Sequence, residues 1–105
     1  MTVSFSIELV HRDGCALVAV IGELDLTTAP DLERVLSEVV EGGATDLVID
    51  MAACEFIDSK GIGVLLHANQ TARRLILRSP KAIVRKVIEA LGLNEILQIE
   101  ESENV

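Results

Sequence analysis

Aromatic residues are almost missing from this sequence, which has Phe5 and Phe56 but no Trp or Tyr. A hydrophobic core must therefore be built from Val, Ile, Leu and Ala. Proteins that bind single-stranded nucleic acid stack bases on aromatic side chains, so this class is disfavoured. The chain has 105 residues, half of them hydrophobic. That is the size of one domain, which buries enough surface to fold without a disulfide or a metal.

Cysteine is also scarce, and the positions of the two cysteines argue against a disulfide bond and against a metal site. Cys15 and Cys54 are far apart, lack the CxxC spacing and lie in apolar surroundings. Such residues are typical of a buried, reduced core. A tetrahedral zinc site needs more ligands than these and the scattered His11 and His67 supply. We therefore predict buried thiols, no metal site and no cofactor.

Positive charge is in short supply, with 9 Lys and Arg against 17 Asp and Glu and a formal net charge of -8. Nucleic-acid-binding domains usually carry a basic footprint, so nucleic acid is not an expected partner. Most of the basic residues lie between positions 73 and 86. We expect this segment to be either a solvated face or a contact for an acidic partner. The sequence has no signal-peptide pattern and no apolar run of about 20 residues. We expect a cytoplasmic protein without membrane contact.

The hydrophobic pattern predicts alternating strands and helices. Residues 3–10 alternate apolar and polar and, with a turn signal at 13–14, predict a hairpin with the continuously apolar strand 15–21. A threonine at 27 or 28 caps the first helix, which ends at the glycines 42–43. The other predicted elements are a strand at 46–51, a helix at 60–73, a strand at 75–77, a helix at 79–91 and a short strand at 96–99.

This order of elements predicts a single α/β domain over residues 1–105, with a core over 1–99 and a solvated tail over 100–105. Right-handed crossovers between successive strands imply a mixed, partly parallel sheet of four to five strands. Each helix has one apolar stripe. We therefore expect the helices to pack mainly against one face of the sheet.

Residues 56–65 (FIDSKGIGVL) combine a helix start with an unusual pair of glycines. Asp58 and Ser59 are residue types that cap helices, but Gly61 and Gly63 fall in the first turns of the helix that follows. Each glycine costs about 0.5–1 kcal/mol of helix stability relative to alanine. The pair favours either tight packing against the sheet or close approach of another backbone. The free N–H groups of a helix start also favour phosphate or another anion.

Three separated motifs carry a family resemblance. Residues 58–65 (DSKGIGVL) match the pattern D-S-[S/T]-G-[L/I]-G-V-[L/I] except at Lys60. Residues 22–25 (GELD) precede a helix start at 28–30 (TAP), and residues 79–93 end in ALGL. Together they resemble the bacterial anti-sigma factor antagonists, which consist of a STAS domain. The resemblance covers essentially the whole chain, with the motifs in the right order.

The resemblance implies a protein-binding switch and not an enzyme. Antagonists of this family bind an anti-sigma factor that is also a serine kinase, and this binding frees a sigma factor for transcription. The kinase then phosphorylates the serine after the motif aspartate, here Ser59, which releases the antagonist until a phosphatase resets it. The residues expected to contact the partner are Asp25, Asp58, Ser59, Lys60, Gly61, Ile62 and Gly63.

Two departures from the pattern keep other functions open. The family usually has Ser or Thr where this chain has Lys60, and residues 72–74 (ARR) replace the usual Gly-Gly before the next strand. The alternative is a STAS module that binds its partner without phosphorylation, in a stress-signalling complex or as an accessory subunit of a lipid-transport ATPase. A serine hydrolase is disfavoured, because Ser59 lies in no G-x-S-x-G motif and neither His11 nor His67 has a triad context. Ser59 could also act only as a helix cap.

Overall fold

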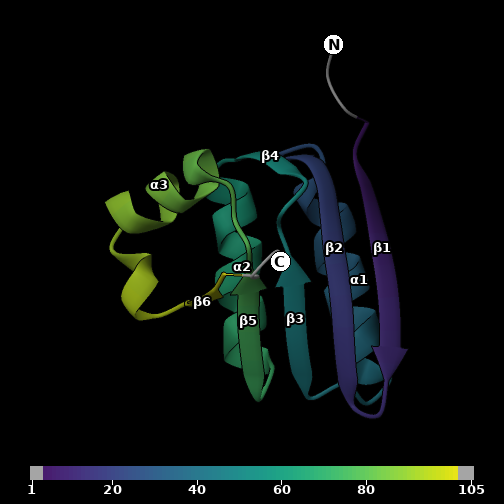
Figure 1. Ribbon diagram of the computed structural model, residues 1–105. Helices are drawn as coiled ribbons and strands as arrows, with labels where there is room; N and C mark the ends of the chain where they lie inside the picture. The colour runs from purple at the N-terminus through teal and green to yellow at the C-terminus, as the bar shows by residue number, and fades with distance from the viewer. Residues whose placement is uncertain (1–3, 102–105) are drawn as a thin grey trace.

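A mixed, six-stranded sheet is the framework of the molecule. The computed structural model describes residues 4–101, and this part contains six strands, three α-helices and one short 3-10 helix (Figure 1). In chain order the elements are β1 (Ser6–Arg12), β2 (Cys15–Leu24), α1 (Ala29–Glu41), β3 (Asp46–Asp50), β4 (Cys54–Ile57), α2 (Ser59–Thr71), β5 (Arg74–Arg78), α3 (Ala82–Ala90), η1 (Leu93–Glu95) and β6 (Gln98–Glu100).

The strands pair in the order β1-β2-β3-β5-β6, and β4 pairs with β2 outside this row. The hairpin β1–β2 is antiparallel, whereas the other pairs are parallel. β4 uses residues 22–24 of β2, beyond the stretch of β2 that pairs with β3. Between β3 and β4 the Asp50 carboxylate accepts a hydrogen bond from the Ala52 N–H at 3.0 Å, which turns the chain.

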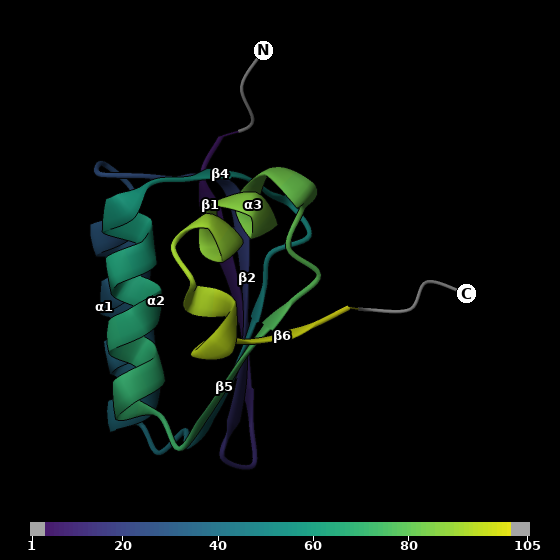
Figure 2. The same ribbon diagram turned by 90° about the vertical axis from the view of Figure 1, so that its left-hand side faces the viewer.

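The core lies between the sheet and the helices α1 and α2, which stand side by side against one of its faces (Figure 2). α3 instead packs against β4, towards one end of the sheet. Alternate strand residues and one stripe of each helix meet in this core, as period-2 and period-3.6 patterns require. Its largest fully buried side chains include Leu24, Leu32, Leu47, Ile49, Met51, Ile57, Leu65, Leu77, Ile88 and Leu97.

The predicted α/β class is confirmed, together with the hairpin and the three helices. α1 has Thr28 as its N-cap residue and ends directly before Gly42, as predicted. The second and third helices are shorter than predicted, at Ser59–Thr71 and Ala82–Ala90. The start of the predicted first strand at residue 3, and residues 102–105 of the predicted tail, lie outside the described residues.

Two strands differ from the prediction. β4 is absent from the prediction, so the sheet has six strands instead of the predicted four to five. Its four residues are too few to show an alternating pattern. The last strand lies at Gln98–Glu100, two residues later than its predicted start, because the 3-10 helix at Leu93–Glu95 occupies the connection.

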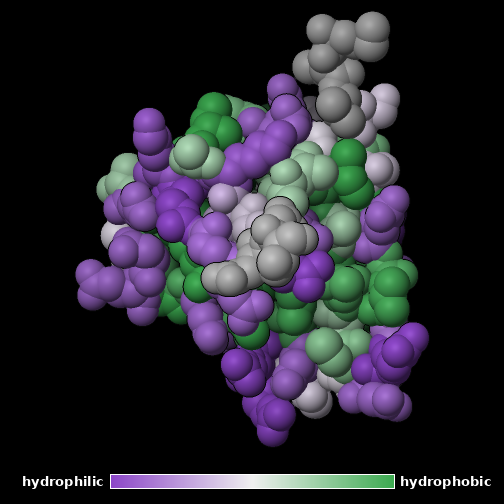
Figure 3. Space-filling view, viewed as in Figure 1, coloured by the Kyte–Doolittle hydropathy of each residue, from purple (hydrophilic) through white to green (hydrophobic). Residues whose placement is uncertain are grey.

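The face of the sheet opposite α1 and α2 is covered by no described helix and mixes apolar with charged residues (Figure 3). Apolar side chains gather over β1 to β3, with charged side chains around them. Much of the basic segment at 73–86 is paired within the chain, in the ion pairs Arg73–Asp46, Arg78–Asp50, Lys81–Glu55 and Arg85–Glu101. Four of the six basic side chains in this segment are therefore paired with an acidic residue of the same chain.

The prediction that both cysteines are buried is wrong for Cys15. Cys54 is buried and Cys15 is exposed, and both are free thiols. Cys15 is the first residue of β2, where Ala16 and Val18 point into the core. Because side chains alternate along a strand, Cys15 points to the open face of the sheet, next to its register partner Arg12.

We predict that the two thiols react at very different rates. Burial raises the pKa of the Cys54 thiol, so this group is both shielded and protonated near neutral pH. Titration of the native chain with a thiol reagent should therefore modify one cysteine quickly and the second only after unfolding. In Cys15→Ser the fast phase should vanish, and in Cys54→Ser it should stay. A fast phase that survives in Cys15→Ser would contradict this assignment.

Candidate functional site

Two loops meet at the carboxyl ends of β2 and β4. These strands run parallel, and Leu24 at the end of β2 pairs with Ile57 at the end of β4. The Asp58 N–H donates to the Leu24 carbonyl at 3.2 Å, which joins the two strand ends. Asp25 and Asp58 therefore follow neighbouring strands at one edge of the sheet, where parallel α/β sheets commonly place their binding sites.

Asp58 caps α2 and ties it to the neighbouring loop. One carboxylate oxygen accepts from the Gly61 N–H at 3.0 Å, which is the standard bond of an N-cap residue. The other oxygen accepts from the Leu26 N–H, also at 3.0 Å. One side chain thus fixes both the start of the helix and the loop between β2 and α1.

Asp25 shapes its own loop. Its carboxylate accepts from the N–H groups of Thr27 at 3.0 Å and Thr28 at 3.2 Å. The Thr28 hydroxyl accepts from the Asp25 N–H at 2.9 Å and donates to the Glu23 carbonyl at 2.7 Å. These bonds hold the loop rigidly in front of α1. They also explain why Thr28 is the N-cap residue of α1 without making a side-chain cap bond.

Ser59 is the first residue of α2, and both it and Lys60 are exposed. Within residues 4–101 the Ser59 hydroxyl has no hydrogen-bond partner. It lies at the positive end of the helix dipole, next to backbone N–H groups of the first turn. The site therefore presents a free hydroxyl where an added phosphate would be stabilised by its own helix.

The two glycines of α2 have different surroundings. A Cβ at Gly61 would lie 2.9 Å from the Leu24 carbonyl oxygen and equally close to side-chain carbons of Leu24 and Ile57, so the packing of α2 against β2 and β4 needs a glycine there. A Cβ at Gly63 would meet no atom within 4 Å, and Gly63 is exposed. Gly63 lowers the stability of the helix by about 0.5–1 kcal/mol relative to alanine, and no packing within the described chain requires a glycine there. This favours the interpretation that a partner approaches closely at Gly63.

The structure brings the predicted contact residues together in two layers. Ser59, Lys60 and Gly63 are exposed, and Asp25 and Asp58 are half-buried beside them. Gly61 is buried and Ile62 is only 4 % exposed, so both lie beneath the surface and support it by packing. The surface that we continue to predict as the partner contact is therefore Asp25, Asp58, Ser59, Lys60 and Gly63.

Sequence reasoning missed several residues around this surface. Leu26 is 69 % exposed, a high value for a leucine, and its N–H is the group bound by Asp58. A shallow depression of about 320 Å³ is lined by Ser59, Lys60 and Gly63 and by three residues not predicted there, Glu33, Val64 and His67. Val64 lies four residues after Lys60 and His67 lies four residues after Gly63, so helical spacing could have placed both of them, but only the fold places Glu33.

Two kinds of feature are absent from residues 4–101. No group of three or more His, Cys, Asp or Glu side chains could hold a metal ion in this part of the chain. None of the helices described there is long and apolar enough to cross a membrane.

Removal of the Asp58 cap should destabilise the fold measurably. We expect Asp58→Ala to lower the free energy of unfolding by about 1–2 kcal/mol, since both the N-cap bond and the bond to the loop are lost. Urea unfolding measures this change. The matched control is Asp31→Ala, because Asp31 lies in the first turn of α1 and makes only an exposed ion pair with Arg34. An equal effect in both variants would contradict the special role of Asp58.

Comparisons with known proteins agree with this architecture. The family model for the STAS domain matches residues 6–105. RsfB of Mycobacterium tuberculosis, named an anti-sigma-F factor antagonist, is 29% identical over 99 residues, which cover 91% of this chain and 81% of RsfB. A crystal structure of an anti-sigma factor antagonist from Mycobacterium paratuberculosis superposes with a TM-score of 0.84 at 29% identity, covering 92% of this chain and 86% of that one. The anti-sigma factor antagonist SpoIIAA in its unphosphorylated form gives 0.79 at 26% identity, with coverages of 96% and 90%.

Proposed function

Because the chain belongs to the STAS domain family, we propose that it is an anti-sigma factor antagonist, which binds an anti-sigma factor and thereby frees a sigma factor for transcription. Three relatives that each match more than 90% of its length carry this description. The observation that carries the proposal is the exposed start of α2, where Ser59, Lys60 and Gly63 form a surface beside a rigid loop. On this proposal the chain works in the cytoplasm by binding and performs no chemistry itself.

We further propose that the partner is a serine kinase and that Ser59 is its substrate. The Ser59 hydroxyl oxygen attacks the γ-phosphorus of ATP, the bond from the γ-phosphorus to the bridging β-phosphate oxygen breaks, a general base of the kinase takes the hydroxyl proton, and ADP leaves. The phosphate brings a charge of about -1.5 to -2 to a surface already flanked by Asp25 and Asp58. The partner that bound a neutral hydroxyl then loses affinity and dissociates.

The fold is expected to survive this modification. Ser59 is exposed and lies at the positive end of the α2 dipole, so the phosphate needs no rearrangement of the core. The switch therefore acts at the contact surface by charge and size. A phosphatase that hydrolyses the phosphoserine restores the neutral hydroxyl and the binding state.

Lys60 supports a second candidate function. Its exposed ammonium group lies next to Ser59 and forms no ion pair within residues 4–101. In this position it could pair with a phosphate on Ser59 and weaken the switch, or serve a partner that binds without phosphorylation. The second candidate is therefore a constitutive STAS interaction module in another assembly.

A sigma-release assay tests the proposed function. The purified chain is added to preformed complexes of the host's anti-sigma factors with their sigma factors, without ATP, and free sigma factor is measured. We expect release from one complex, and equal release by Ser59→Ala and by Ser6→Ala, an exposed serine on β1 that serves as control. When ATP is added, release by wild type and Ser6→Ala should decline, whereas release by Ser59→Ala should persist. Release from none of the complexes would contradict the antagonist function.

A further inference from the structure

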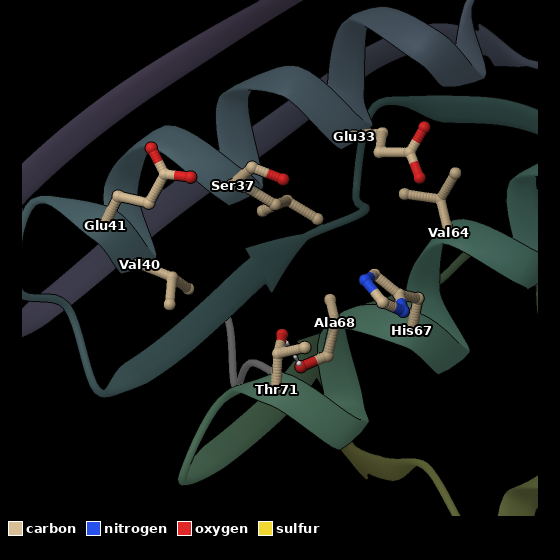
Figure 4. A pocket seen from close by; sticks show the side chains of 9 residues that line it. Glu33, Ser37, Val40, Glu41, Val64, His67, Ala68 and Thr71 are labelled. Atoms are coloured by element: carbon tan, nitrogen blue, oxygen red, sulfur yellow. Dashed lines mark hydrogen bonds between the residues drawn. The ribbon is translucent and has the colours of Figure 1, made fainter.

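A groove runs between α1 and α2, away from the loops that surround Ser59 (Figure 4). Side chains from both helices point into it, so it is a surface shared by two elements (Figure 4). Its floor is apolar and its rims are polar. The residues that line it are Glu33, Leu36, Ser37, Val40 and Glu41 of α1, and Val64, His67, Ala68 and Thr71 of α2.

The size of the groove decides what class of ligand it suits. Its volume is about 180 Å³. Pockets for drug-sized molecules and cofactors occupy about 300–1,000 Å³. Taken alone, the groove is smaller than such pockets, and it has room for one large aliphatic side chain, which would contact Leu36, Val40, Val64 and Ala68 on the floor.

The charge of the groove is one-sided. Glu33, Ser37 and Glu41 follow one another at a spacing of four residues and form the α1 rim. The two carboxylates are therefore about 12 Å apart along the helix. Neither carboxylate forms an ion pair within the described chain, although five other acidic residues there do. This rim is thus free to bind cations, whereas the opposite rim of His67 and Thr71 carries no acid.

We propose that this groove binds a basic amphipathic helix of a partner protein, with one Leu-sized side chain on the floor and Lys or Arg on either side, about two turns apart. That spacing matches the separation of Glu33 and Glu41. A helix laid in an apolar groove is a common mode of recognition. The groove is continuous with the depression beside Ser59, because Glu33, Val64 and His67 line both. The proposal does not depend on phosphorylation of Ser59.

Titration of the full chain with designed peptides tests the proposal by amide chemical shifts. The probe is an alanine-based helix of about four turns with two lysines two turns apart and one leucine between them on the same face. We expect saturable shifts at Ser37, Val40, Val64 and Ala68. Two matched peptides, one with glutamates in place of the lysines and one with alanine in place of the leucine, should bind at least about ten-fold more weakly.

Charge-reversal variants locate the contact. Glu33→Lys and Glu41→Lys should each weaken binding of the lysine peptide by about three- to ten-fold. In the wild type, about 0.5 M salt should also weaken binding, because salt screens the attraction between the glutamates and the lysines. Glu38→Lys makes the same change in net charge on α1 outside the groove and should have little effect. No saturable binding, shifts that map elsewhere, or equal losses in all three variants would overturn the proposal.

Discussion

Ser59→Asp should weaken binding of the anti-sigma factor by about 2–3 kcal/mol, which corresponds to about thirty- to a hundred-and-fifty-fold in the dissociation constant. The substitution places a carboxylate on an exposed surface beside Asp25 and Asp58, where the partner would have to desolvate it at a contact suited to a neutral hydroxyl. The thermal midpoint should stay nearly unchanged, because Ser59 is exposed at the start of α2 and an acidic residue suits the first turn of a helix. Isothermal titration calorimetry and thermal unfolding measure the two quantities separately.

The control for this prediction is Ser59→Ala, which removes the hydroxyl without adding charge. It should keep the affinity within a few-fold of wild type, since the loss of one exposed hydroxyl contact costs little. If Ser59→Asp binds as tightly as Ser59→Ala, then Ser59 does not lie at the interface. If Ser59→Asp unfolds many degrees earlier, its effect is structural, and the proposed switch at the surface is wrong.

The paired variants Gly61→Ala and Gly63→Ala should shift stability in opposite directions. In Gly61→Ala the new methyl group is forced against the Leu24 carbonyl oxygen, and we expect a net loss of about 1–2 kcal/mol after the gain in helix propensity. A change of 1 kcal/mol moves the midpoint of a domain of this size by about 4–8 °C. Gly63→Ala meets no neighbouring atom and should stabilise the chain by about 0.5–1 kcal/mol.

The two variants should affect partner binding in the opposite way to stability: the stabilised variant should lose affinity, and the destabilised one should largely keep it. Gly63→Ala should bind the anti-sigma factor about ten-fold more weakly in spite of its higher stability, because the methyl group stands where the partner approaches. Folded Gly61→Ala should bind more nearly as the wild type does, since residue 61 is buried. A stabilised Gly63→Ala with unchanged affinity would show that Gly63 does not serve the interface.

Much of the fold could be predicted from local patterns. The alternation around Ile7 and Leu9, the turn at residues 13–14 and the capped helix after Thr28 each specify their own structure over a few residues. β4 could not be predicted in this way, because its four residues carry no period and are fixed by pairing with the end of β2. The exposure of Cys15 was missed for a similar reason. A continuously apolar strand does not reveal which of its residues point to an uncovered face.

The centre of the site could be predicted, whereas its surroundings could not. Asp58 and Ser59 are residue types that favour the start of a helix, and the structure confirms that a helix starts there. The closeness of Asp25 to Asp58 depends on β4, which joins Ile57 to Leu24 and so aligns the two following loops. The depression and the groove depend on the distance between α1 and α2. This distance is set by tertiary packing and cannot be predicted from the sequence of either helix.

The structure also separates roles that the motif leaves together. Within one run of residues, Asp58 holds the helix start, Gly61 allows it to pack against the sheet, and Gly63 remains open to solvent. Ser59 lies between these fixed points, with its hydroxyl free. This arrangement suits a group that must be rigidly presented, modified and recognised without any change in the fold.

The measurement that tests the central claim most directly is phosphotransfer to Ser59. The chain is incubated with ATP and each histidine-kinase-like serine kinase of its organism, the intact mass is recorded, and the products are separated by size with the kinase present. We predict that one kinase adds a single phosphate to the wild type and none to Ser59→Ala, and that the phosphorylated chain no longer elutes with that kinase. No gain in mass with any of the kinases, or the same gain in Ser59→Ala, would contradict the claim.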